Sequence, residues 1–153
     1  MAKAIFLRKG PNGLLLPADD DAREKLDKYK VGATLQAEVK QAHNYAFLRK
    51  MHALFKLAYD HFVEYGVGEQ TYKGQRVTPD YDRFRKDLTI LAGHYTPVFR
   101  IDGSVRLEAK SISYDKADNE AREKIFDDVL NVALDRVYRG SMSEGQLRYL
   151  IEQ

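Results

Sequence analysis

The sequence predicts a single α+β domain, residues 1–153, in which two long helices and a shorter one pack with β-hairpins. Two apolar stripes at helical spacing, over residues 45–65 and 116–138, predict the long helices. Two pairs of short β-prone runs flank strong turn signals and predict hairpins. A chain of 153 residues is long enough to bury a core of its own.

The first 40 residues are expected to form a subregion made of a hairpin, a helix and a strand. The turn Gly10-Pro11-Asn12-Gly13 separates two apolar runs, and Pro17 ends the second run. Three aspartates then stand where a helix N-terminus favours negative charge. The expected elements are strands over residues 3–7 and 14–16, a helix over 18–29 and a third strand over 34–39.

Residues 41–139 are expected to form the core, in the order helix, helix, hairpin, helix. Asn44 is a favourable N-cap for the helix over residues 45–65, and a loop is expected over 66–78. Pro79 suits the first turn of a second helix, and Gly93 suits its C-terminal end. That helix is expected over residues 80–92.

The last third of the chain is expected to begin with a hairpin. Asp102-Gly103 lies between its two arms, residues 95–101 and 104–113. Asp115 is the expected cap of the helix over 116–138. In residues 140–153, Ser143 and Gln146 match a capping box and predict a short terminal helix.

Composition excludes several kinds of site. The chain has no cysteine, which rules out disulfides and cysteine-based zinc sites. The four histidines lack metal-ligand spacing, so we expect neither a metal nor a cofactor. No apolar run suits a signal peptide or a membrane span. We therefore expect a cytoplasmic protein with no membrane partner, in the host cytoplasm if a phage encodes it.

One pattern resembles a catalytic site. Asp102 with Glu108 and Lys110 matches the Asp then Glu-x-Lys arrangement in which two carboxylates hold Mg²⁺ and a lysine steadies the attacking water. Asp102 falls in the expected turn, and Glu-x-Lys arises easily by chance in a chain with 31% charged residues. We expect no enzyme, and a Mg²⁺-dependent nuclease is kept as an alternative.

Basic and aromatic residues alternate in the middle of the chain, which indicates nucleic-acid binding. Residues 29–114 carry 13 bases against 9 acids. Lysine and arginine neutralise phosphates while tyrosine and phenylalanine stack on unpaired bases. A solvated helix face is the competing interpretation. The candidate DNA-binding residues are Arg49, Lys50, Lys73, Arg76, Arg83, Arg85, Lys86, Arg100, Arg106 and Lys110.

The segment Asn44-Tyr45-Ala46-Phe47-Leu48-Arg49-Lys50-Met51-His52-Ala53-Leu54 resembles a tailed-phage family of unknown function with an Asn-x-x-Phe-x-x-Lys/Arg-x-x-Ala-Leu helix. With the hairpin, the Ser111-Ile112-Ser113 stretch and the long helix that follow, residues 40–139 are more distantly similar to the NinB (Orf) recombination mediators of phage lambda type. The resemblance implies a homodimer that binds single-stranded DNA in a basic cleft, contacts single-strand-binding protein and has no catalytic residues.

These observations predict a phage recombination or repair accessory protein that binds single-stranded DNA. The alternative is a protein-interaction module that modulates a host repair or defence enzyme. Its acidic C-terminal helix, with Glu120, Glu123, Asp127 and Asp128, is the surface expected to meet a basic partner.

Overall fold

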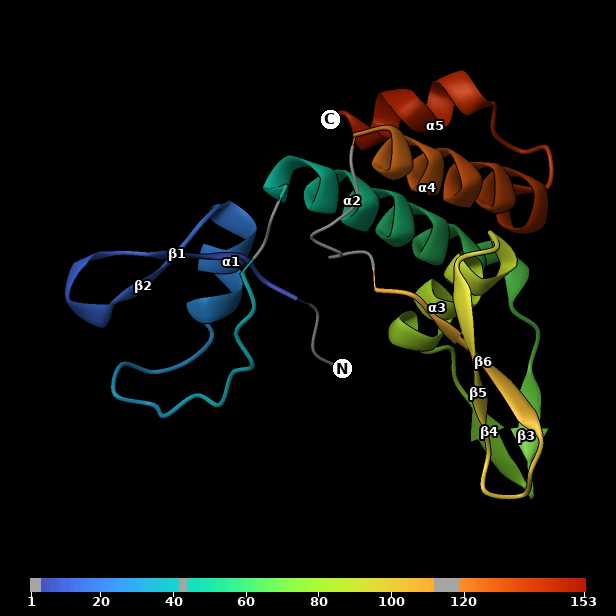
Figure 1. The fold of residues 1–153 in the computed structure, drawn as a ribbon, viewed down its shortest axis with the longest axis horizontal. Coiled ribbons are helices and arrows are strands. Elements are labelled where there is room, and N and C mark those ends of the chain that lie inside the picture. Colours follow the sequence, from blue (N-terminus) through green and yellow to red (C-terminus); the bar gives the residue numbers. More distant parts are fainter. Residues whose placement is uncertain (1–3, 42–43, 112–118) are drawn as a thin grey trace. The chain divides into compact units, whose positions relative to one another are not determined.

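The computed structural model describes residues 4–41, 44–111 and 119–153 of an α+β protein, 50% helical and 16% strand. This confirms the predicted fold class. In the part of the chain so described, the strands form three separate two-stranded antiparallel hairpins (Figure 1). The chain divides into two compact units, Met1–Lys40 and Gln41–Gln153, a boundary that coincides with the end of the expected N-terminal subregion.

The first unit consists of one hairpin and one short helix. Strands β1 (Leu7–Lys9) and β2 (Leu15–Pro17) pair through the turn η1 (Pro11–Gly13), in which Asn12 takes the left-handed conformation. Strand β1 therefore lies nearer the turn than expected, and β2 begins one residue later than expected. Helix α1 (Asp20–Leu26) begins at Asp19, whose carboxylate accepts a hydrogen bond from the Ala22 amide at 2.8 Å.

The third strand expected in this unit is wrong. Residues 34–39 form no strand, and Leu35 and Val39 are exposed. A strand needs a partner for its amides and carbonyls, and none of the described strands pairs with this segment.

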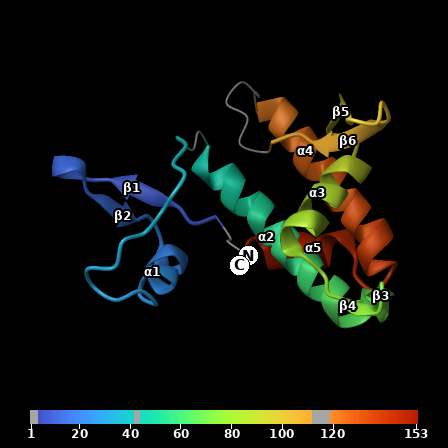
Figure 2. The same cartoon turned by 90° about the horizontal axis from the view of Figure 1, so that it is seen from below.

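Four helices form the core of the second unit (Figure 2). They are α2 (Tyr45–His61), α3 (Tyr81–Leu91), α4 (Asn119–Val132) and α5 (Glu144–Ile151). Helices α2 and α4 each continue into a π-helical turn, η2 (Phe62–Gly66) and η3 (Ala133–Tyr138). The long helices over 45–65 and, within the described residues, 119–138 are thus confirmed, while Asp115 lies outside the described residues.

Side chains from all four helices fill this core. Each fully buried large apolar side chain contributes about 1.5–3 kcal/mol. Aromatic rings join α2 and η2 to α3. Tyr59 of α2 meets Tyr81 edge-on with ring centroids 5.3 Å apart, and Phe62 of η2 stacks on Phe84 at 5.0 Å. The largest buried side chains are Phe55, Phe126, Met51, Leu54, Leu130, Leu147 and Val129.

Helix starts follow the sequence with two exceptions. Ser143 and Gln146 form the expected capping box of α5. Helix α3 begins one residue later than expected, because Asp80 is its N-cap. The Asp80 carboxylate accepts a hydrogen bond from the Arg83 amide at 2.8 Å. Asn44 makes no cap with its side chain; it takes a left-handed conformation, and with its amide oxygen toward α4 it accepts from the Arg122 guanidinium at 2.8 Å. This hydrogen bond to Arg122 takes the place of the side-chain cap that was expected of Asn44.

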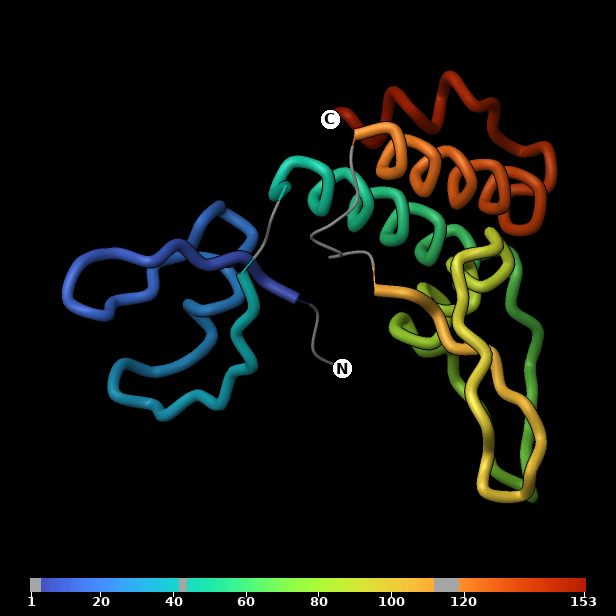
Figure 3. Tube along the Cα trace, in the orientation of Figure 1, coloured from blue at the N-terminus to red at the C-terminus, as the bar shows by residue number. Residues whose placement is uncertain are grey.

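Two hairpins extend from this helical core. Strands β5 (Tyr95–Phe99) and β6 (Val105–Ala109) form the expected one, and β6 packs on α3 (Figure 3). The loop expected over residues 66–78 is wrong in part, because β3 (Gln70–Tyr72) and β4 (Gln75–Val77) form a second hairpin there. Its two turn residues, Lys73 and Gly74, both have positive φ, as a tight hairpin turn requires.

Candidate nucleic-acid interface

The β5–β6 hairpin has one apolar face and one polar face. Its register places Pro97 opposite Leu107, and Phe99 opposite Val105. Because side chains alternate across a strand, these four residues share a face with Tyr95 and Ala109. That face is largely exposed, since Phe99 keeps 86% of its surface and Val105 keeps 58%. We call it the apolar face of the hairpin.

The opposite face carries the cations. Val98 pairs with Arg106, and the backbone hydrogen bonds Arg100 N to Ser104 O and Lys110 N to His94 O continue the same register at both ends. Arg100, Arg106 and Lys110 therefore lie on one face, which we call the cationic face. Within the described part of the chain, none of the three forms an ion pair. Glu108, which pairs with Thr96, lies on the same face between Arg106 and Lys110 and offsets part of their charge.

The β3–β4 hairpin adds two more cations and an exposed ring. The Lys73 ammonium lies 5.4 Å from the centroid of the Tyr72 ring, and Tyr72 is 67% exposed. Arg76 pairs across the ladder with Thr71. Figure 1 shows both hairpins extending away from the helical core, and in the view of Figure 2 α3 lies between them. A ligand lying along α3 would meet both.

The three bases on α3 differ from those on the hairpins because acids of the same helix neutralise them. Arg85 and Lys86 both pair with Asp82, at 2.7 and 3.0 Å, and Arg83 pairs with Asp87 at 2.9 Å. The two cations hold the pKa of Asp82 below its usual value, although burial opposes the shift. The helix thus presents little net charge to a polyanion.

Arg49 and Lys50 lie apart from the hairpin cations. Arg49 lies 5.8 Å from the Tyr45 ring on α2 itself, and the Lys50 ammonium lies 3.9 Å from the centroid of the Phe126 ring on α4. Arg148 of α5 approaches the same ring. Lys50 therefore helps to pack α2 against α4 through the Phe126 ring. The structure does not bring Lys50 together with the hairpin cations.

The nuclease-like residues are not assembled. Asp102 lies in the β5–β6 turn, where its carboxylate accepts hydrogen bonds from the amide and hydroxyl of Ser104 at 2.9 and 2.6 Å. These bonds lower the pKa of Asp102 and give it a turn-forming role. Glu108 lies three residues beyond Val105, about 10 Å further along the strand. That separation is too long for one Mg²⁺, whose ligands lie at about 2.1 Å.

No group of three or more histidine, aspartate or glutamate side chains is placed to hold a metal ion in residues 4–41, 44–111 and 119–153. Over the same residues, no helix is long and apolar enough to cross a membrane.

A charged network holds the base of the β5–β6 hairpin to α4. Asp128 accepts from His94 Nε2 and from Lys124 Nζ, both at 2.9 Å. Burial raises the pKa of Asp128, but the hydrogen bonds from Lys124 and His94 outweigh it and hold this pKa below its ordinary value. The sequence predicted that Asp128 belongs to an acidic surface for a partner. In the structure its carboxylate is instead bonded to His94 and Lys124.

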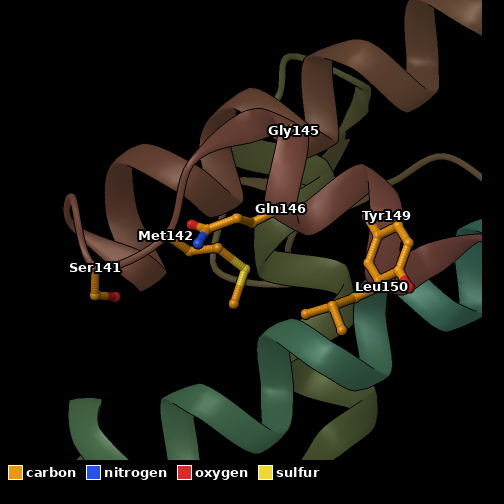
Figure 4. Close-up of a pocket in the computed structure, with 6 residues that line it drawn as sticks. All are labelled: Ser141, Met142, Gly145, Gln146, Tyr149 and Leu150. Carbon is orange, nitrogen blue, oxygen red and sulfur yellow. The ribbon is translucent and has the colours of Figure 1, made fainter.

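Two neighbouring hollows lie near the C-terminal helix. One, of about 450 Å³, is lined mainly by apolar groups, and Figure 4 shows Met142 and Leu150 pointing from the end of the chain toward α2. The other, of about 570 Å³, lies where the two π-helical turns meet and is lined by His61, Tyr138 and two arginines among others. Sequence reasoning missed both, because neither π-helical turn has a sequence signature.

The apolar face was also missed in part. On the first arm of the hairpin, Tyr95, Pro97 and Phe99 alternate with Thr96 and Val98. That alternation was the available signal. It shows that both arms share one apolar face.

Comparison with protein families gives one match, to the family described as "Protein of unknown function (DUF1367)", over residues 1–73 and 67–147. No curated protein and no solved structure matches the chain significantly. The family match covers nearly the whole chain and includes both hairpins of the second unit, helices α2, α3 and α4, and the first half of α5. The chain therefore belongs to the DUF1367 family.

Proposed function

We propose that this protein binds single-stranded DNA through its two exposed hairpins. The observation that carries the proposal is the set of cations without ion pairs to any described residue: Lys73, Arg76, Arg100, Arg106 and Lys110. Such cations replace the counterions of a phosphate backbone at no cost in broken ion pairs. The α3 bases contribute less, because a phosphate must first displace Asp82 or Asp87.

Exposed rings favour single strands over duplexes. Tyr72 stands in solvent beside Lys73, so a base and its phosphate could be held by adjacent side chains. Stacking on an aromatic side chain is worth about 1–3 kcal/mol per base and requires a base that is not already stacked in a duplex. We therefore expect preference for single strands without sequence readout.

The number of free cations sets the expected salt dependence. Five phosphate contacts on a single strand give a slope of log K against log salt of about −3.5. Raising the salt fourfold would then weaken binding by about a hundredfold. A fluorescence-anisotropy titration with a labelled oligothymidine and a matched duplex, at 50 and 200 mM salt, measures both numbers. No binding at 50 mM, or tighter binding to the duplex, would remove the proposal.

A variant pair separates stacking from charge. Tyr72→Ser should weaken single-strand binding severalfold and leave the salt slope unchanged, because it removes a ring and no charge. Tyr149→Ser, an equally exposed ring on α5, is the matched control and should have no effect.

We extend the proposal to phage recombination or repair, with contact to single-strand-binding protein. Its support is the resemblance of residues 40–139 to the NinB recombination mediators. Pull-down of purified single-strand-binding protein, with nuclease present, tests it: retention without DNA supports a direct contact, and loss of retention on nuclease treatment contradicts it.

A second candidate function is self-association through the apolar face of the β5–β6 hairpin. A second copy of the chain offers the same uncharged face, so the contact is self-complementary, as a two-fold dimer requires. Exposed aromatic and aliphatic residues on this face amount to roughly 500 Å² per copy. A dimer that covered this whole face on both copies would bury about 1,000 Å² in total, the lower limit for a specific interface. The cationic faces would point away from the contact and stay available to DNA.

Sedimentation equilibrium between about 1 and 200 μM tests this dimer. The wild type should approach twice the mass of the 17.6 kDa chain, and Phe99→Ser should shift dissociation at least tenfold to higher concentration. Tyr149→Ser is again the control. A monomeric wild type over the whole range, or an unaffected Phe99→Ser dimer, contradicts the interface.

A further inference from the structure

The hollow at the ends of α2 and α4 combines rings and cations. Its lining includes Phe62 from η2, Tyr138 from η3, and the two arginines Arg136 and Arg139. The His61 imidazole contacts two tyrosine rings at tilted angles, with its centroid 4.5 Å from that of Tyr138 and 4.8 Å from that of Tyr65. A volume of about 570 Å³ falls in the range of small-molecule sites.

The local backbone is unusual on both sides of this hollow. Two π-helical turns pack together, and π-helical turns are rare and concentrate at functional sites. Arg139 takes a left-handed conformation with φ 50°, which is unfavourable for residues other than glycine. Its Nε donates to the Arg136 carbonyl at 3.2 Å, which fixes the guanidinium beside the hollow.

Tyr138 provides an unused donor. Tyr138 is only 3% exposed and lines the hollow. Its hydroxyl forms no hydrogen bond with another described residue. Burial first, and then the charge of Asp60, raise the pKa of Tyr138 to about 12. The hydroxyl therefore stays protonated near neutral pH and is available to a ligand as a hydrogen-bond donor.

We infer that this hollow binds a nucleoside monophosphate, with the base against the His61 and Tyr65 rings and the phosphate on Arg139 and Arg136. The two guanidiniums differ in strength: Arg136 shares its charge with Asp135 at 3.5 Å, whereas Arg139 pairs with no acid in the described part of the chain. Arg139 is therefore the main phosphate ligand. The adjoining hollow of Figure 4 has no charged lining residue and offers no comparable anchor.

Isothermal titration calorimetry with three probes tests the inference on the full chain. Deoxyadenosine monophosphate contains ring and phosphate, deoxyadenosine contains the ring alone, and inorganic phosphate contains the anion alone. The monophosphate should bind with a dissociation constant below about 1 mM, at least tenfold more tightly than either part. Binding by phosphate alone, with equal strength, would overturn the ring site; no binding of the monophosphate at several millimolar would overturn the whole site.

Variants then locate the site. Arg139→Ala should weaken the monophosphate at least tenfold without changing deoxyadenosine, and Tyr65→Ala should weaken both, since Tyr65 is exposed and its loss does not open the core. Arg83→Ala, a cation on α3, is the control. Amide shifts on titration should concentrate in residues 61–66 and 136–142, and shifts confined to the hairpins would contradict the location. An oligonucleotide titration reports on the hairpins separately, so failure here leaves the proposed DNA binding to stand or fall by itself.

Discussion

Asp128 joins the β5–β6 hairpin to the helical core, and replacing it by asparagine tests that role. Asp128→Asn keeps the shape of the side chain and removes the charge that accepts from His94 and Lys124. Hydrogen bonds to charged groups contribute about 1.5–3 kcal/mol when buried, and exposed ion pairs about 0.2–1 kcal/mol. With Asp128 28% and His94 20% exposed, we expect a loss of about 1–2 kcal/mol. That loss lowers Tm by about 3–6 °C in a chain of this length.

The same variant should change the pH dependence of stability. Because the pKa of Asp128 is lower in the folded protein than its ordinary value of 3.8, its charge stabilises the fold above that value. This stabilisation is lost as the pH falls through the folded-state pKa. The difference between wild type and Asp128→Asn should therefore be present at pH 7 and pH 5 and shrink below pH 3.8.

Urea denaturation followed by circular dichroism, at pH 7, 5 and 3, measures this difference. Asp87→Asn is the matched control, because Asp87 makes a single exposed pair on α3 and should lose at most about 0.5 kcal/mol. Equal losses in the two variants at pH 7, or an Asp128→Asn difference that grows in acid, would refute the reasoning.

Three further predictions concern stability. Phe126→Ala, at a ring that is 1% exposed, should cost about 3–5 kcal/mol in urea denaturation at pH 7, and a loss below 1 kcal/mol would contradict its place in the core. Ser143→Ala breaks the capping box of α5 and should cost about 1 kcal/mol, whereas Ser143→Asp should restore most of it. Gly103→Ala places a side chain at a φ of 85° in the β5–β6 turn and should cost about 1 kcal/mol. Amide exchange should become faster than in the wild type in β5 and β6 but not in β3 and β4.

Local signals in the sequence predicted much of the fold. Asp102-Gly103 specified the β5–β6 turn, and Ser143 with Gln146 specified the start of α5, because each involves residues a few positions apart. The apolar stripes specified the long helices for the same reason. The sequence did not predict the β3–β4 hairpin, because the left-handed turn position is held by Lys73, where asparagine or glycine is usual.

The candidate site was less predictable, because it depends on which charges find partners. Arg83, Arg85 and Lys86 had the same chemistry in the sequence as Arg100 and Arg106, yet only the first three meet acids in the structure. Their i, i+3 and i, i+4 spacing to Asp82 and Asp87 was visible in the sequence. The tie between Asn44 and Arg122 is a long-range contact that no local pattern reports.

The central claim, that the hairpins and not α3 bind single-stranded DNA, is tested most directly by two double variants with equal loss of charge. We would measure the affinity of Arg100→Ala with Arg106→Ala and of Arg83→Ala with Arg85→Ala for oligothymidine, at 50 and 200 mM salt. The hairpin variant should bind at least tenfold more weakly, with a salt slope reduced by about 1.4, while the α3 variant should stay within about threefold of wild type. Weaker binding by the α3 variant than by the hairpin variant would contradict the claim.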